Sequence, residues 1–173
     1  YTGIPSGFSA LDTMTSGFQD SEMVIIGARP SMGKTALALS MIQHIAIQKN
    51  IPTGFFSLEM SNTQIGQRLF SQVARISGSK IRSGMLTQAD FQRLQDAAGR
   101  CYDAPLYIVD TPNMKMLDLR AMARKMKQQE IHNFTYNIRY TIFYIHFRDA
   151  LYYTIFFNIL STEILRFLEV SHK

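Results

Sequence analysis

The sequence has little of the residue types that fix a structure by covalent or metal bonds. It contains one cysteine, Cys101, and no tryptophan. A single cysteine excludes an internal disulfide framework and a zinc site built from cysteines, and it suits a reducing compartment. No leader of basic and apolar residues opens the chain at Tyr1. We therefore expect a cytoplasmic protein whose sequence is cut from a longer polypeptide.

Long apolar runs are also missing. A membrane span takes about 18 or more apolar residues together, and the apolar stretches 140–147 and 150–157 are separated by Arg148 and Asp149. We therefore expect no membrane partner. The charge excess is small, with 18 basic against 13 acidic residues. It permits a polyanionic partner without identifying one.

Glycine, proline and methionine do not occur in the last 43 residues, 131–173, although the whole chain has 10, 5 and 10 of them. The same segment holds eleven of the 12 phenylalanines and 8 tyrosines taken together. We therefore predict an ordered domain over residues 1–130 and an aromatic-rich tail of unknown structure over residues 131–173. Such a tail either finds a partner surface or aggregates. The same composition arises where a reading frame has been lost.

The segment 23–35, MVIIGARPSMGKT, is the motif around which the chain is organised. Its β-branched start predicts a strand, its centre a loop with glycine and proline, and residues 36–48 a helix. A strand, a glycine-containing loop and a helix in this order are typical of a phosphate-binding loop.

The pattern G-x-x-x-x-G-K-[ST] is met at Gly33, Lys34 and Thr35. Ala28 stands where the first glycine of the pattern is expected, and Gly27 lies one position too early. The departure matters little if Ala28 adopts the required turn, because phosphate binding needs consecutive backbone N–H groups and alanine supplies one.

These residue types predict a nucleoside triphosphate site. Lys34 is expected to reach the β- and γ-phosphates and Thr35 to ligate Mg²⁺ through its hydroxyl. The N–H groups at the start of the helix hold phosphate charge. The predicted nucleotide-binding residues are Ala28, Arg29, Pro30, Ser31, Met32, Gly33, Lys34 and Thr35. The alternative is a glycine turn that precedes lysine and threonine by chance.

Two carboxylates follow predicted strands. Glu59 follows the strand 53–58, and adjacent parallel strands present their C-terminal ends to one crevice. Glu59 is therefore the candidate to orient or deprotonate an attacking water, the alternative being a carboxylate that only favours a helix dipole. Asp110 follows the strand 106–109, and we interpret it as a turn former before a Thr-Pro pair.

The remaining pattern predicts strands that alternate with capped helices, which means an α/β fold with a parallel sheet. Ser61 with Gln64 and Thr87 with Asp90 form capping boxes. The glycine- and serine-rich segment 77–86 is predicted to be a surface loop. The predicted helices are 36–48, 62–76, 87–101 and 117–129, and the predicted strands are 24–26, 53–58 and 106–109.

Five motifs carry a resemblance to a known family. In order they are GIPSGFSALDTMTSGF, MVIIGARPSMGKT, FFSLEMS, SGMLT and LYIVDTP. They resemble the C-terminal ATPase domain of the bacterial replicative DNA helicases, the DnaB family, over about residues 3–130. The resemblance implies an incomplete RecA-like P-loop NTPase core that binds ATP and Mg²⁺. It implies a homo-hexamer that encircles single-stranded DNA, with other replication proteins as further partners. By the same resemblance Lys34 is the loop lysine, Thr35 the Mg²⁺ ligand and Glu59 the catalytic glutamate.

The sequence departs from that family after Glu130. The resemblance implies an apolar strand that ends in the Walker B aspartate, and later an arginine finger. No aspartate stands at the expected place, and Asp149 comes too late. An arginine finger is worth about 10³ to 10⁵ in rate. We therefore expect nucleotide binding with slow turnover in this chain.

The leading hypothesis is an ATP-hydrolysing helicase domain. Two alternatives stay open at this point. One is a RecA-like recombination or repair ATPase. The other is a non-catalytic nucleotide-binding or interaction module whose aromatic tail docks on a partner.

Overall fold

The structure is a computed structural model that describes residues 2–20, 22–29, 31–111, 114–131, 140–148 and 151–159. Its centre is one five-stranded sheet with the strand order β1-β5-β4-β2-β3. The strands are β1 (Met23–Ala28), β2 (Thr53–Ser57), β3 (Leu106–Val109), β4 (Tyr140–Arg148) and β5 (Leu151–Ile159).

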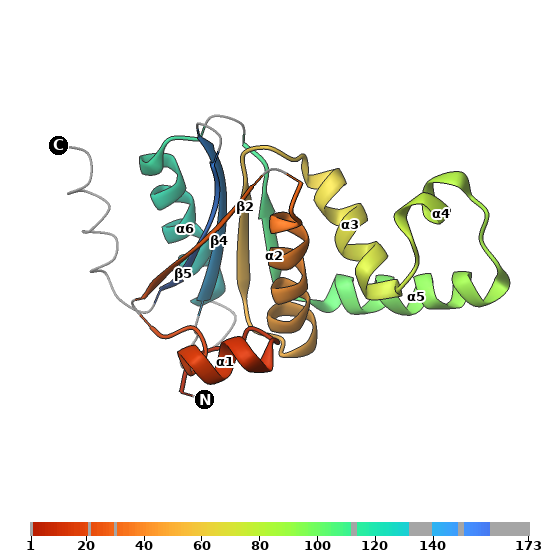
Figure 1. Ribbon diagram of the computed structural model, residues 1–173, viewed down its shortest axis with the longest axis horizontal. Helices are drawn as coiled ribbons and strands as arrows, with labels where there is room; N and C mark the ends of the chain where they lie inside the picture. Colours follow the sequence, from red (N-terminus) through yellow and green to blue (C-terminus); the bar gives the residue numbers. More distant parts are fainter. Residues whose placement is uncertain are drawn as a thin grey trace.

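Helices cover both faces of this sheet. Figure 1 shows α6 on one face and α2 on the other, with α3, α4 and α5 projecting beyond α2. The helices are α1 (Ser9–Thr15), α2 (Lys34–Ile42), the π-helix η1 (Gln43–Gln48), α3 (Asn62–Ala74), α4 (Gly78–Ser83), α5 (Gln88–Asp103) and α6 (Met116–Ile131). The result is a layered α/β domain, as the alternation of strands and helices predicts.

The predicted parallel pairing is confirmed around β2. This strand pairs in parallel with β3 on one side and with β4 on the other. Its five residues are all buried, and Phe55 and Phe56 have no exposed surface. Phe55 packs in one cluster with Leu39 of α2 and Ile65 of α3. Fully burying side chains of this size stabilises by about 1.5–3 kcal/mol each.

The segment 131–173 contributes two strands that the sequence did not predict. β4 and β5 form an antiparallel pair, and β5 also pairs antiparallel with β1, Met23 opposite Phe157. The sheet is therefore mixed. Helix α6 runs through Ile131, across the proposed boundary at residue 130. The division into two regions and the loss of reading frame stay predictions.

The helix after the glycine loop differs in detail from the predicted helix 36–48. It begins two residues earlier, at Lys34, and changes from α to π geometry at Gln43. Near its end the N–H of Lys49 donates to the carbonyl of His44 at 3.0 Å, a bond that spans five residues. The earlier start matters because it brings Lys34 into the first helical turn.

The prediction of a surface loop over 77–86 is wrong in part, because α4 forms within it. Ser77 caps this helix by accepting the N–H of Lys80 at 3.2 Å. The ammonium of Lys80 then binds the carboxylate of Asp90, which comes from α5. An ion pair thus joins this short helix to α5, a contact that the local pattern does not reveal.

Asp90 is the centre of a charged cluster. Its carboxylate is bound by Lys80 and, at 2.9 Å, by Arg93, and it accepts the N–H of Thr87 at 3.0 Å. Both predicted capping boxes, at Ser61 and at Thr87, are confirmed. The bond from Lys80 holds the pKa of the Asp90 carboxyl well below its usual range, and the bonds with Thr87 act in the same direction.

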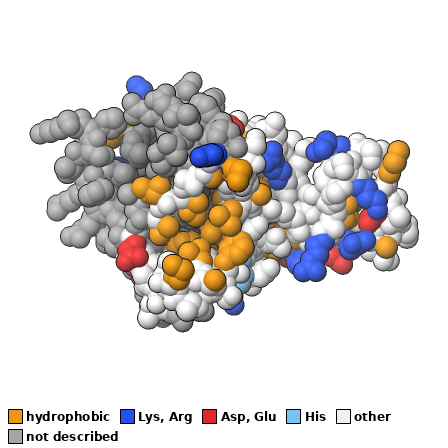
Figure 2. Space-filling model, viewed as in Figure 1, with side chains coloured by type: hydrophobic (Ala, Val, Ile, Leu, Met, Phe, Trp, Pro, Cys, Tyr) orange, Lys and Arg blue, Asp and Glu red, His pale blue; other side chains and the backbone are white. Residues whose placement is uncertain are grey.

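Two regions of the surface differ in character. Figure 2 shows apolar side chains gathered over α1 and β1, whereas charged side chains cover α3–α5. Among the apolar residues Met14 and Ile25 are exposed. Cys101 on α5 is half-buried, and this burial raises the pKa of its thiol. Within the described residues no helix is both long and apolar enough to cross a membrane.

Candidate nucleotide-binding site

The loop between β1 and α2 reverses the chain sharply. Gly33 has a φ of +86° and Ser31 a φ of +63°. The left-handed region is open to glycine without steric cost, so the glycine of Gly-Lys-Thr is required by the backbone itself. Ala28 is the last residue of β1, opposite Tyr152 of β5. Alanine is compatible with this position because a strand residue needs no positive φ.

Lys34 is the first residue of α2 and is buried, with 8% of its surface exposed. The N-cap residue is Gly33, so no side chain caps the first turn. Uncapped N–H groups at a helix start attract anions. Burial lowers the pKa of the Lys34 ammonium, and the charge of Glu59 opposes this effect in part. A bound phosphate would raise the same pKa, since it supplies negative charge.

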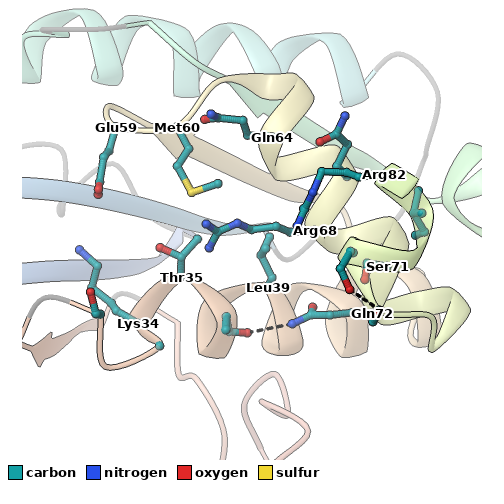
Figure 3. A pocket seen from close by; sticks show the side chains of 18 of the residues that line it. Lys34, Thr35, Leu39, Glu59, Met60, Gln64, Arg68, Ser71, Gln72 and Arg82 are labelled. Atoms are coloured by element: carbon teal, nitrogen blue, oxygen red, sulfur yellow. Dashed lines mark hydrogen bonds between the residues drawn. The ribbon is translucent and has the colours of Figure 1, made fainter. Parts of the chain in front are cut away.

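Glu59 lies in the short connection between β2 and α3. At the end of β2, the Ser57 hydroxyl donates to the carbonyl of Met60 at 2.8 Å and accepts the Met60 N–H at 3.0 Å. These two bonds fold the connection back on the strand end. Figure 3 shows the Glu59 carboxylate and the Lys34 ammonium facing each other, with Thr35 beside them. The predicted adjacency of the two strands is wrong, because β5 and β4 lie between β1 and β2 in the sheet. The two side chains nevertheless line the same pocket.

A pocket of about 1260 Å³ opens over these residues and reaches α3 and α4. Among the described residues that line it, the cations are Arg29, Lys34, Arg68 and Arg82, and Glu59 is the one carboxylate. Four cations against one carboxylate favour a polyanionic ligand such as a triphosphate. The pocket is larger than the range of about 300–1,000 Å³ typical of small-molecule sites, so a nucleotide fits with room for water.

The pocket brings together most of the predicted site residues. Those that line it are Arg29, Ser31, Gly33, Lys34, Thr35 and Glu59. Ala28 and Met32 do not line it, and Met32 is 73% exposed at the loop tip. Pro30 lies outside the described residues. Asp149 also lies outside them, although β4 ends at the residue before it, so its predicted irrelevance stays a prediction.

Sequence reasoning missed Arg68, which is on α3. Figure 3 shows its side chain reaching toward Thr35. A signal existed, since Arg68 is one turn beyond the Ser61–Gln64 capping box. Its direction, however, depends on how α3 packs against α2.

Sequence reasoning also gave Asp110 a purely local role. The structure shows that its carboxylate accepts the N–H of Asn62, the first residue of α3, at 2.6 Å. The prediction of a turn former was therefore incomplete, because the partner lies 48 residues away.

The residues present fit a Mg²⁺ ion that is held mainly by the phosphates of a bound nucleotide. No group of three His, Cys, Asp or Glu side chains within the described residues is placed to hold a metal. Mg²⁺ commonly keeps several waters and binds substrate phosphates with only one or two protein oxygens. A single hydroxyl such as that of Thr35 suits this mode of binding.

The fold and the loop together define a RecA-like P-loop nucleotide-binding domain. The family model described as the DnaB-like helicase C terminal domain matches residues 3–139. The chain belongs to this family.

Relatives of known name agree. The chain is 59% identical over 128 residues to the replicative DNA helicase DnaB of Treponema pallidum, covering 74% of this chain and 29% of the relative. It is 45% identical over 128 residues to DnaB of Geobacillus stearothermophilus, covering 74% and 28%. The chain therefore spans less than a third of these relatives.

Solved structures show the same core. One is a DnaB-like replicative helicase studied with its interactions with primase, at a TM-score of 0.73 and 30% identity, covering 82% of this chain and 34% of that one. Another is a structure described as an ATPase domain, at a TM-score of 0.69 and 27% identity, covering 82% and 48%. The predicted incomplete RecA-like core is confirmed. A recombination ATPase and a non-catalytic module are not favoured.

Proposed function

We propose that this chain is the ATP-binding and ATP-hydrolysing part of a replicative DNA helicase. The observation that carries the proposal is the pocket that Lys34 and Thr35 of α2 line together with Glu59 from the connection after β2. Lys34 binds the β- and γ-phosphates, and Thr35 offers its hydroxyl to Mg²⁺. The backbone of Ser31–Gly33 and the side chain of Arg29 complete the phosphate cradle.

In this proposal Glu59 acts on the water that attacks the γ-phosphate. Its carboxylate accepts a hydrogen bond from that water and takes its proton as the oxygen bonds to phosphorus. The bond from the γ-phosphorus to the bridging oxygen breaks, and ADP leaves with the electron pair on its β-phosphate. The lysine opposite stabilises the phosphate charge that develops in the transition state. Bound Mg²⁺ would supply further neutralisation of the phosphate oxygens.

The partners proposed for the intact protein follow from its relatives. Both relatives described above carry the name replicative DNA helicase. We propose that the intact protein works in the cytoplasm as a homo-hexamer on single-stranded DNA, together with other replication proteins. The primase interactions of one structural relative support the last point. An unwinding assay with a forked duplex and the full-length protein tests the helicase activity, and absence of unwinding contradicts it.

The experiment for the site itself is single-turnover hydrolysis of MgATP with the protein in excess, which detects slow chemistry. We expect Glu59→Gln to lower the rate by about 10²- to 10⁴-fold, since a positioned base contributes that much. Nucleotide affinity is expected to change little. The matched control is Glu22→Gln, because Glu22 is exposed and lies outside the pocket. An unchanged rate for Glu59→Gln contradicts the role of Glu59.

A further inference from the structure

Asp110 leaves the sheet beside the strand that leads to Glu59. Val109 at the end of β3 is opposite Phe56 in the parallel pair with β2. Asp110 follows Val109, and Ser57 follows Phe56. The two residues therefore lie side by side at the same edge of the sheet. From there the Asp110 carboxylate accepts the N–H of Asn62 at 2.6 Å.

The bond satisfies a particular group of α3. Asn62 is the first helical residue, and its N–H is among the donors that have no partner inside the helix. The Ser61 hydroxyl accepts a different N–H, that of Gln64, at 3.3 Å. Asp110 and Ser61 thus each accept one backbone N–H of the first helical turn. A bond from N–H to a charged carboxylate is shorter and stronger than a neutral one.

The segment 58–61 between β2 and α3 is only four residues long. The bonds of Ser57 to Met60 and of Ser61 with Gln64 act within this stretch and its flanks. The bond from Asp110 is different, because it ties the end of the segment to another strand. It links the first residue of α3 to the residue that follows β3, and the segment that carries Glu59 ends at this link.

We propose that Asp110 is a positioning residue that holds the segment 58–61, and with it Glu59, in the geometry needed for ATP hydrolysis. This inference rests on the proposed function of Glu59. Glu59 is exposed, so packing alone does not fix its direction. A misplacement of about 1 Å by a residue away from the chemistry costs up to about 100-fold in rate.

The test is single-turnover hydrolysis of MgATP by the full chain and its variants. We expect Asp110→Ala to lower the rate about tenfold, with nucleotide affinity within about twofold of the original. Asp110→Asn keeps an oxygen that accepts the Asn62 N–H, so its rate is expected to lie between the two. In a Glu59→Gln background, Asp110→Ala is expected to have no further effect, since it acts through Glu59.

The matched control is Asp118→Ala. The Asp118 carboxylate accepts the N–H of Lys115 at 3.3 Å and so caps α6 within its own segment. Its loss is expected to leave the hydrolysis rate unchanged. Hydrogen exchange supplies a readout without activity. The amide of Asn62 is expected to exchange faster in Asp110→Ala, while the amides of α6 keep their original rates.

The outcomes separate the inference from the function beneath it. If Glu59→Gln keeps the original rate, the proposed function is wrong and Asp110 has nothing to position. If Glu59→Gln is slow but Asp110→Ala is as fast as the original, only the positioning role is overturned. A purely structural role is shown by an equal loss of affinity and rate, or by a further drop in the double variant. If Asp110→Ala does not fold, Asp110→Asn decides between the same outcomes.

Discussion

Two charged regions of this molecule use the same residue types in opposite ways. In the cluster at Asp90 one carboxylate is bound by Lys80, Arg93 and the Thr87 backbone. In the pocket at Lys34 four cations face one carboxylate among the described lining residues, and burial lowers the pKa of the lysine. At Asp90 both cations are paired directly with the carboxylate, whereas at Lys34 four cations share one carboxylate and the excess of positive charge is larger.

The difference separates structure from function. The bonds at Asp90 join α4 to α5 and need no further partner. The excess of positive charge over α2 raises the free energy of the free protein and is relieved by an anion. Perturbed groups in a pocket are typical of functional sites. Four predictions test this contrast, beginning with the largest expected effect.

Lys34→Met is expected to weaken MgATP binding by about 100-fold or more. Truncating one partner of a desolvated charge pair costs about 2–5 kcal/mol, and about 1.4 kcal/mol is a factor of ten. Titration calorimetry measures the affinity. The control is Lys115→Met, since Lys115 is exposed and outside the pocket. Equal MgATP affinities for the two variants would show that Lys34 does not bind the nucleotide.

Gly33→Ala is expected to weaken nucleotide binding by about tenfold. A side chain at a φ of +86° costs about 1–2 kcal/mol, so the loop relaxes away from its turn. The space around Gly33 is open, so the effect reports backbone strain and not a clash. Gly99→Ala is the control, because Gly99 lies inside α5, also with open space around it. Unchanged binding by Gly33→Ala would show that the loop tolerates the substitution.

Asp90→Asn is expected to lower stability at neutral pH and to leave nucleotide affinity unchanged. The folded-state pKa of Asp90 is depressed below its ordinary value of 3.8. Its stabilisation is therefore present above about pH 4 and is lost as the pH falls below that value.

Urea unfolding at pH 6 and at pH 3 measures this effect. The difference in the free energy of unfolding between the original protein and Asp90→Asn is expected to be large at pH 6 and smaller at pH 3. Asp96→Asn on the same helix is the control, because Asp96 is exposed. A gap that stays constant with pH would contradict the ion-pair role of Asp90.

The smallest effect has the opposite sign. Without nucleotide, Lys34→Met is expected to raise the free energy of unfolding by about 0.5 kcal/mol, since functional sites give up stability for function. The folded pKa of Lys34 is lowered, so the penalty is present below that pKa and disappears as the pH rises toward 10.5. The stability difference between the two proteins should shrink over the same range. A lower free energy of unfolding for Lys34→Met would show that the charge of Lys34 stabilises the fold, as the charges around Asp90 do.

Local signals predicted the part of the fold that local bonds make. The capping boxes at Ser61 and Thr87 each lie within four residues, and α3 begins at the predicted residue and α5 one residue after it. Gly33, Lys34 and Thr35 form a continuous motif, so the loop was also predictable. Glu59 and Lys34 line one pocket as expected, although the expectation assumed adjacent strands and β5 and β4 lie between β1 and β2.

The features that were missed involve partners outside the local segment. The ion pair between Lys80 and Asp90 joins α4 to α5, and the Asp110 carboxylate accepts the N–H of Asn62. The antiparallel pairing of β5 with β1 joins residues more than a hundred positions apart. No glycine or proline stands between the sequences of β4 and β5, so the pattern held no hairpin signal.

The half-buried thiol of Cys101 has a practical consequence. Thiolate is the form that reacts with maleimides and other alkylating probes, and a raised pKa keeps Cys101 protonated at neutral pH. Because Cys101 is also the only cysteine of the chain, the unmodified sequence reacts little with such probes, which suits labelling at a single introduced cysteine. A cysteine placed at Met32, which is 73% exposed at the tip of the loop, would react first. A fluorophore there would report nucleotide arrival at the loop in real time.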